Sequence, residues 1–162
     1  MREVHLDQSA IGRQSKPAVN EVERGAIRRF AESLGETNPL YFDEAAAKAA
    51  GYRGLVAPPT FPISLKAGSD LREGLMVMPG ANLLQSEQSF EYARPIVAGD
   101  KLTVRSKIAE MSQLVTPTGP ADVVVIEDEG HDETGTLVYR SRSLWVVRAP
   151  PRHAGTGETV HE

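Results

Sequence analysis

One stretch decides the fold: Phe90-Glu-Tyr-Ala-Arg-Pro-Ile-Val-Ala-Gly-Asp-Lys-Leu102 ends one strand, bends at Gly99-Asp100 and begins another. Working outward from it, the second half of the chain predicts antiparallel strands over residues 84–93, 101–114, 123–129 and 136–148. The last of these strands places six residues on one face: Leu137, Tyr139, Ser141, Ser143, Trp145 and Val147. Glycine and proline between the strands predict turns.

The first half of the chain predicts helices. We expect Asn20 to cap a helix over about residues 21–34, in which apolar residues recur at helical spacing and which Gly35 ends. Asp43 is expected to cap a short, alanine-rich helix over residues 44–50.

A third helix is expected to begin at Pro58 or Pro59, since the first turn of a helix needs no amide donor. Its residues up to Ala67 are mostly apolar or small, and a helix without a polar face belongs inside the fold. This order of elements predicts an α+β fold, a curved antiparallel sheet wrapped around a central helix.

Length and composition indicate one domain. Its 162 residues predict a lead-in over residues 1–18, the domain over 19–148 and a disordered tail, rich in glycine, proline and threonine, over 149–162. A net charge of −4 argues against binding to nucleic acid or to anionic membranes. No cysteine is present and no histidine pair has metal-ligand spacing, so we expect no metal and no cofactor. Without an 18-residue apolar run or a signal peptide's apolar core, we expect no membrane span and a cytoplasmic location.

Two motifs carry a family resemblance: Gly35-Glu-Thr-Asn-Pro-Leu-Tyr41 and, after the short helix, Ala57-Pro-Pro-Thr-Phe61. They resemble the active-site segment of the MaoC-like, R-specific enoyl-CoA hydratases, which reads Gly-Asp-x-Asn-Pro-x-His and is followed by a helix and a hydrophobic-Ala-Pro-Pro run. The stretch from Phe90 to Leu102 is also similar to a signature of hot-dog dehydratases. The resemblance covers about residues 19–148 and implies a single hot-dog fold.

The resemblance implies that Glu36 and Tyr41 occupy the catalytic acid and base positions. Glu36 keeps the carboxylate on a side chain one methylene longer, whereas a tyrosine with a pKa near 10 is a poor base at neutral pH. The alternative is that Glu36 is a solvated loop residue and that Tyr41 packs in a crevice.

The resemblance also implies substrate-binding residues. Asn38 would orient the acid and base or a water, although it suits a plain turn equally well. The segment Ala57, Pro58, Pro59, Thr60 and Phe61 would face the thioester carbonyl, with amides available from Ala57, Thr60 and Phe61 only; the alternative is an ordinary helix start. In the glycine-punctuated residues 68–82, Met76 and Met78 are expected to line or cover an acyl channel.

The departures at positions 36 and 41 resemble the FAS1-like N-terminal branch of the superfamily, in which a subunit without the histidine pairs with one that has it. We therefore expect a hydratase/dehydratase of enoyl-CoA or 3-hydroxyacyl-CoA thioesters, or a component of one. Alternatives are a non-catalytic acyl-CoA-binding subunit with a histidine-containing hot-dog partner, or a hot-dog thioesterase. The expected partners are an acyl-CoA or acyl-carrier-protein thioester and a second hot-dog chain, in a homodimer or heterodimer. Cations suited to the phosphates of coenzyme A are candidates by residue type alone: Lys66, Arg94, Lys101 and Arg105.

Overall fold

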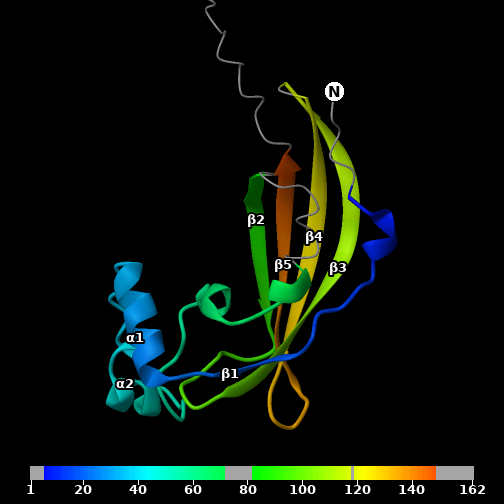
Figure 1. Ribbon diagram of the computed structural model, residues 1–162. Coiled ribbons are helices and arrows are strands. Elements are labelled where there is room, and N and C mark those ends of the chain that lie inside the picture. Colours follow the sequence, from blue (N-terminus) through cyan, green and yellow to red (C-terminus); the bar gives the residue numbers. More distant parts are fainter. Residues whose placement is uncertain (1–5, 72–81, 118, 149–162) are drawn as a thin grey trace, which may run out of the picture.

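A computed structural model of the 162-residue chain describes residues 6–71, 82–117 and 119–148. Its centre is one antiparallel sheet in the order β1-β3-β4-β5-β2, which curls into a half-barrel (Figure 1). The strands are β1 (Ala18–Glu21), β2 (Asn82–Tyr92), β3 (Lys101–Thr116), β4 (Gly119–His131) and β5 (Leu137–Arg148). The expected tail over 149–162 lies outside the described residues, as does most of the glycine-punctuated segment that holds Met76 and Met78.

The curved antiparallel sheet expected from the sequence is confirmed. The first part of β3 alternates buried and outward residues, and Leu102, Val104 and Ile108 are almost completely buried there, whereas β4 is buried continuously over residues 121–126. A single extra residue interrupts the register of β3 at Ala109 and of β2 at Ser86. Such bulges bend a strand and increase its twist, which suits a curled sheet.

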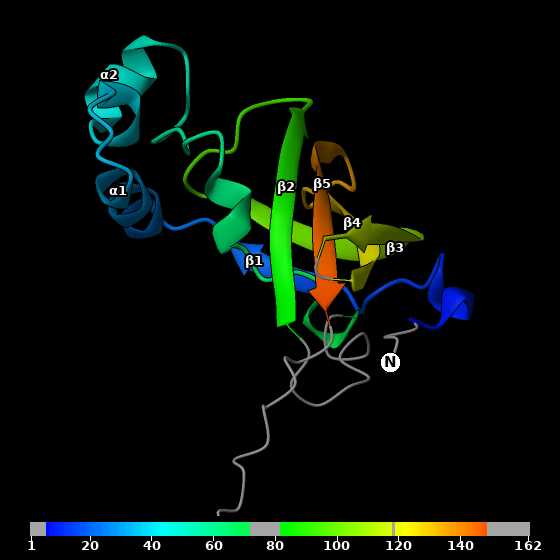
Figure 2. The same cartoon turned by 90° about the horizontal axis from the view of Figure 1, so that it is seen from above.

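Two short helices lie together to one side of the sheet (Figures 1 and 2). Helix α1 (Arg24–Ser33) ends as predicted at Gly35, whose φ of 69° is one that glycine adopts readily, and the amide of Glu36 closes the end on the carbonyl of Ala31. Helix α2 (Glu44–Ala49) begins with the predicted cap, because the Asp43 carboxylate accepts from the amides of Ala45 and Ala46.

Asn20 was expected to cap the first helix, and this is wrong. It lies in β1, which pairs with β3, and α1 begins four residues later without a side-chain cap. The buried Asn20 side chain accepts from the amide of Lys66 at 2.7 Å and donates to the Lys66 carbonyl at 3.0 Å. Pairing with β3 and these two bonds place Asn20 in a strand.

The placement of a helix from Pro58 or Pro59 to Ala67 is also wrong. Only a single 3₁₀ turn forms there, Phe61–Ser64, and Leu65 to Gly68 are not helical. The Asn20 bonds hold Lys66 in a non-helical backbone, and a β-carbon on Gly68 would overlap the Ser106 side chain. Phe61 is buried, but Ile63 is 59% exposed, so this turn has an outward face that the sequence did not predict.

Residues 6–17, expected as a lead-in, run beside β3. Gly12 and Ser15 donate their amides to the carbonyls of Ile108 and Ser106, both at 2.8 Å. Leu6 is buried against the sheet. Within the described ranges, no helix is long and apolar enough to cross a membrane.

Candidate functional site

The loop Ala57–Phe61 is held by the bend between β2 and β3. Val56 forms an isolated antiparallel bridge with Val97, and the amide of Ala57 donates to the carbonyl of Ile96 at 2.8 Å. The amide of Phe61 donates to the carbonyl of Pro58 at 2.9 Å. Of the three amides expected to be available for a ligand, only that of Thr60 has no backbone acceptor among the described residues.

A groove of about 580 Å³ runs between this loop and β2. Pro59, Thr60 and Ile63 form one side, and residues 85–90 with Tyr92 form the other. The Tyr92 hydroxyl donates to the carbonyl of Pro59 at 2.6 Å and thereby ties the loop to the strand. Burial raises the pKa of Tyr92 to about 12, so its hydroxyl remains a donor at neutral pH.

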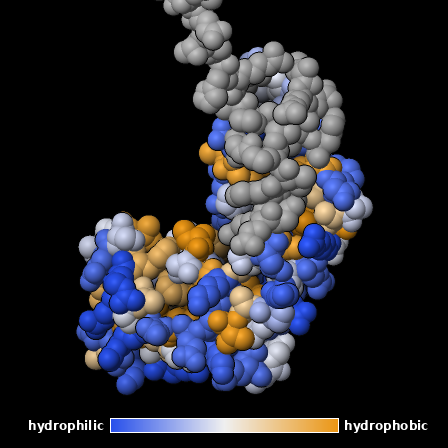
Figure 3. All heavy atoms as spheres, viewed as in Figure 1, coloured by the Kyte–Doolittle hydropathy of each residue, from blue (hydrophilic) through white to orange (hydrophobic). Residues whose placement is uncertain are grey.

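The space-filling view shows apolar side chains gathered on the side of the α1–α2 lobe that faces the sheet (Figure 3). The side chain of Ile63 lines the groove and this residue is 59% exposed; Leu84 on β2 is 61% exposed. Exposed apolar residues grouped along a groove are typical of a surface that binds a ligand or another chain.

The structure does not bring the two predicted catalytic residues together in this groove. Glu36 is exposed directly after α1, and Tyr41 is half-buried in a 3₁₀ turn, Pro39–Tyr41, where it packs against the core cluster that contains Ala57 and Phe61. Neither residue lines the groove. The side chain of Asn38 accepts from the amide of Leu40 at 3.1 Å and so forms the turn that was its alternative reading.

The other predicted binding residues divide into two groups. Pro59 and Thr60 line the groove, whereas Ala57, Pro58 and Phe61 are buried beneath it. Met76 and Met78 lie outside the described residues. Within the described part of the chain, no cluster of three or more histidine, aspartate or glutamate side chains could hold a metal ion.

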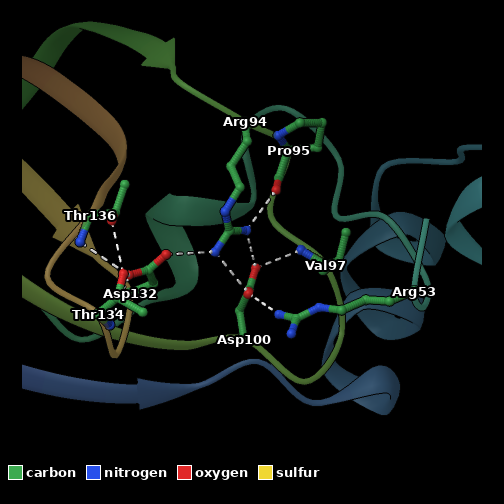
Figure 4. Close-up of polar contacts among 8 residues, drawn as sticks. All are labelled: Arg53, Arg94, Pro95, Val97, Asp100, Asp132, Thr134 and Thr136. Carbon is green, nitrogen blue, oxygen red and sulfur yellow. Dashed lines mark hydrogen bonds and ion pairs between the residues drawn. The ribbon is translucent and has the colours of Figure 1, made fainter. Parts of the chain in front are cut away.

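The buried carboxylate of Asp100 joins the loop that carries Arg53 to the bend that carries Arg94 (Figure 4). Asp100, whose side chain is 2% exposed, accepts from Arg94 at 2.8 and 3.1 Å, from Arg53 and from the amide of Val97 at 2.9 Å. Hydrogen bonding to Asp100 raises the pKa of Arg94. Arg94 also reaches Asp132 in the β4–β5 turn at 3.5 Å, and a hydrogen bond from Thr134 lowers the pKa of Asp132.

Sequence reasoning considered Arg94 only as one cation among several and passed over Arg53 and Asp100. Asp100 lies in the quoted strand-bend-strand stretch, where it was taken only as a turn residue. A carboxylate that follows glycine in a bend, with an arginine six residues before it, is a signal for a buried ion pair, but its partner Arg53 is 47 residues away in sequence.

Comparison with known proteins gives a consistent result. Residues 9–141 match the family model described as FAS1-like, dehydratase domain region. A UPF0336 protein of Streptomyces griseus subsp. griseus is 40% identical over 148 residues, which cover 89% of this chain and 96% of the relative. A chain of the C-terminally truncated HadBC (3R-hydroxyacyl-ACP dehydratase) complex from Mycobacterium tuberculosis has a TM-score of 0.69 and 27% identity, covering 86% of this chain and 97% of that one.

A structure described as a MaoC-like dehydratase has a TM-score of 0.73 and 28% identity, and the match covers 86% of this chain and 42% of that one. These likenesses confirm the hot-dog fold and the resemblance to MaoC-like dehydratases.

Proposed function

The chain belongs to the FAS1-like dehydratase domain family, and from this premise we propose that it is one subunit of an acyl-thioester hydratase/dehydratase. The reaction adds water across the double bond of an enoyl thioester, with oxygen to the β-carbon and a proton to the α-carbon, or runs in reverse. The substrate is an enoyl or 3-hydroxyacyl thioester of coenzyme A or of a carrier protein. The chain acts beside a second hot-dog chain.

One observation carries this proposal: the groove lies along the open edge of β2. That strand ends the sheet, its eleven residues are mostly exposed, and it contains no lysine or proline. Lysine and proline are two of the features that protect an edge from pairing; this edge carries the charges of Glu87 and Glu91 and the bulge at Ser86 instead. No described strand pairs with its outer side, so the edge can accept another strand. A second chain paired there would close the groove against Pro59 and Thr60.

Within the groove, Thr60 supplies the amide that polarises the thioester carbonyl. A fixed amide N–H stabilises the charge that develops on that oxygen as the enolate forms. Tyr92 assists indirectly: it fixes the Pro59 carbonyl, which shares one planar peptide unit with the Thr60 amide. Because this peptide unit is trans, the N–H points away from Tyr92, and its direction is set before the substrate arrives.

The acid and base of the reaction come at least in part from the partner chain. Glu36 is solvated and Tyr41 is packed against the core, so the two side chains do not form a pair at the groove. The likeness to a chain of the two-component HadBC complex supports this division of labour.

The test measures loss of enoyl-thioester absorbance by the chain alone and with a histidine-containing hot-dog partner. We expect slow turnover or none alone and rapid turnover with the partner. If Glu36 takes part as acid or base, Glu36→Gln lowers the rate of the complex by about 100- to 10,000-fold. Equal rates for wild type and Glu36→Gln make this chain a binding subunit, and release of free thiol in place of hydration indicates a thioesterase.

A further inference from the structure

Arg53 separates two hollows of opposite character. One, of about 700 Å³, is lined by carboxylate residues Glu21, Glu23, Glu44, Asp100 and Glu133, together with Arg24 and Lys101. The other, of about 460 Å³, is lined by Gly51, Tyr52, Arg53, Arg94, Pro95 and Val97 and has no carboxylate in its lining. Carboxylates outnumber cations in the lining of the first hollow, whereas the second presents two guanidinium groups, both ion-paired with Asp100.

Asp100 orients the two guanidinium groups without screening them from solvent. Its side chain is 2% exposed and lies between the guanidinium groups of Arg53 and Arg94, as Figure 4 shows. Because the carboxylate is buried, an anion that enters from solvent meets the guanidinium groups first. Holding the arginines in one geometry also reduces the entropy lost when they bind a ligand.

Arg53 retains unused hydrogen-bonding capacity. It donates to Asp100 through Nη2 alone, so its Nη1 and Nε have no acceptor among the described residues, and its side chain is 61% exposed. Arg94, in contrast, uses both terminal nitrogens on Asp100, Asp132 and the carbonyl of Pro95. Arg94 therefore acts as a support, and Arg53 has the free donors that can bind a ligand.

We propose that the hollow between Tyr52 and Val97 binds a phosphate ester, with Arg53 as the principal ligand and Arg94 as its support. Guanidinium groups bind phosphate through two parallel hydrogen bonds. The inference rests on the proposed function, because the phosphate would belong to the carrier of the acyl thioester: coenzyme A or the phosphopantetheine arm of a carrier protein.

The position of the hollow suits the two ends of one such ligand. Arg53 and Thr60 lie on the same loop, so seven residues of chain keep their α-carbons within about 25 Å. Val97 lines the hollow and pairs with Val56, between those two residues. A long, flexible thioester can thus extend from the phosphate site to the Thr60 amide.

The experiment titrates the full-length chain by calorimetry at low ionic strength, with adenosine 3′,5′-bisphosphate in one arm and 4′-phosphopantetheine in the other. Arg53→Gln is expected to weaken binding at least about tenfold. Arg53→Lys is expected to weaken it less, because lysine keeps the charge but cannot form two parallel hydrogen bonds. Arg140→Gln is the matched control: it removes another exposed arginine that is paired with a carboxylate, and it leaves the affinity unchanged.

Tighter binding of the bisphosphate identifies the adenosine end of coenzyme A as the source, and tighter binding of phosphopantetheine identifies the pantetheine phosphate, which coenzyme A and a carrier arm share. The proposal is overturned if neither probe binds wild type, or if Arg53→Gln and Arg140→Gln bind equally well. The proposed function is tested separately with an acyl-pantetheine thioester that lacks phosphate. Turnover of that substrate with the partner chain is independent of Arg53, so either idea can fail without the other.

Discussion

Two tyrosines face each other across neighbouring strands beneath the groove. Tyr92 on β2 pairs with Tyr139 on β5, and their ring centroids are 6.2 Å apart. The hydroxyl of Tyr92 is bonded to Pro59, whereas that of Tyr139, a residue only 1% exposed, has no hydrogen-bond partner among the described residues. Burial, the nearby charge of Asp128 and Tyr92 itself raise the pKa of Tyr139. The two phenols therefore have different roles.

Removing each hydroxyl separates these roles. Tyr92→Phe is expected to lower the free energy of unfolding by about 1 kcal/mol, because it removes a hydrogen bond. Tyr139→Phe is expected to leave stability unchanged or slightly raised, because it removes a buried hydroxyl that makes no bond within the described chain. Urea unfolding of both variants measures the difference, and a large loss for Tyr139→Phe would reveal a partner for its hydroxyl.

Gly130 shows how closely the inner face is packed. It lies opposite Tyr139 on β4, and a β-carbon there would overlap the Cε1 atom of that ring. Gly130→Ala is expected to destabilise the chain by about 1–3 kcal/mol, as overpacking of a core does. Gly25→Ala is the control, because in α1 the added carbon meets only the flexible end of Arg29. Thermal unfolding of both variants tests this, and equal melting temperatures would contradict it.

Among the elements, the short β1 depends most on contacts distant in sequence. Its Asn20 bonds both backbone groups of Lys66, 46 residues away. Asn20→Ala is expected to cost about 1–3 kcal/mol, since it leaves buried backbone groups unsatisfied. Hydrogen exchange at Lys66 should accelerate. Asn38→Ala, which removes a similar bond in an exposed turn, is expected to leave exchange at Lys66 unchanged.

The sequence predicted those elements whose pattern is local. Strands β2 to β5 follow from their turns and alternation, and α2 follows from its Asp43 cap. Strand β1 has only four residues and is defined by its pairing with β3, which no local pattern shows. The helix from Pro58 or Pro59 to Ala67 was predicted from apolar composition, but the bonds from Asn20, which lies outside the segment, hold Lys66 in a non-helical backbone.

The candidate site, too, was predicted only where its sequence pattern is local. The loop from Ala57 to Phe61 was found from its motif, and Thr60 does line the groove. The use of the other two amides was not predictable, because their acceptors are set by the fold. Whether Glu36 and Tyr41 are catalytic stays a prediction.

At the scale of the molecule, the outer face of the sheet is balanced in charge. One row across four strands alternates in sign, Arg105, Glu129, Arg140 and Glu91, with Arg140 bonded to Glu129 at 2.8 Å. Opposite charges across strands favour this register and suit contact with water. The row ends at Glu91 on β2, and no described strand pairs with the outer side of β2, which makes the edge, rather than the face, the expected place of assembly.

Assembly through β2 predicts a mass of at least two chains by sedimentation at micromolar concentration, either alone or with the partner. Leu84→Asp is expected to reduce the mass toward that of one 17.6 kDa chain, because it places a charge on the exposed edge. Val115→Asp is the matched control, since Val115 is 88% exposed near the end of β3, away from that edge. Equal masses for the two variants would place the contact elsewhere.

The ion pairs of Asp100 restrict how loops can be exchanged between related chains. One carboxylate joins the loop of Arg53, the bend that carries Arg94 and, through Arg94, the turn that holds Asp132. Replacing the bend between β2 and β3 with a version that keeps a carboxylate at position 100 but lacks Arg94 leaves that buried carboxylate with Arg53 alone, because Arg94 makes two of its bonds. We therefore expect a chimera to keep its stability best when the loop of Arg53 and the bend of Arg94 and Asp100 are exchanged together.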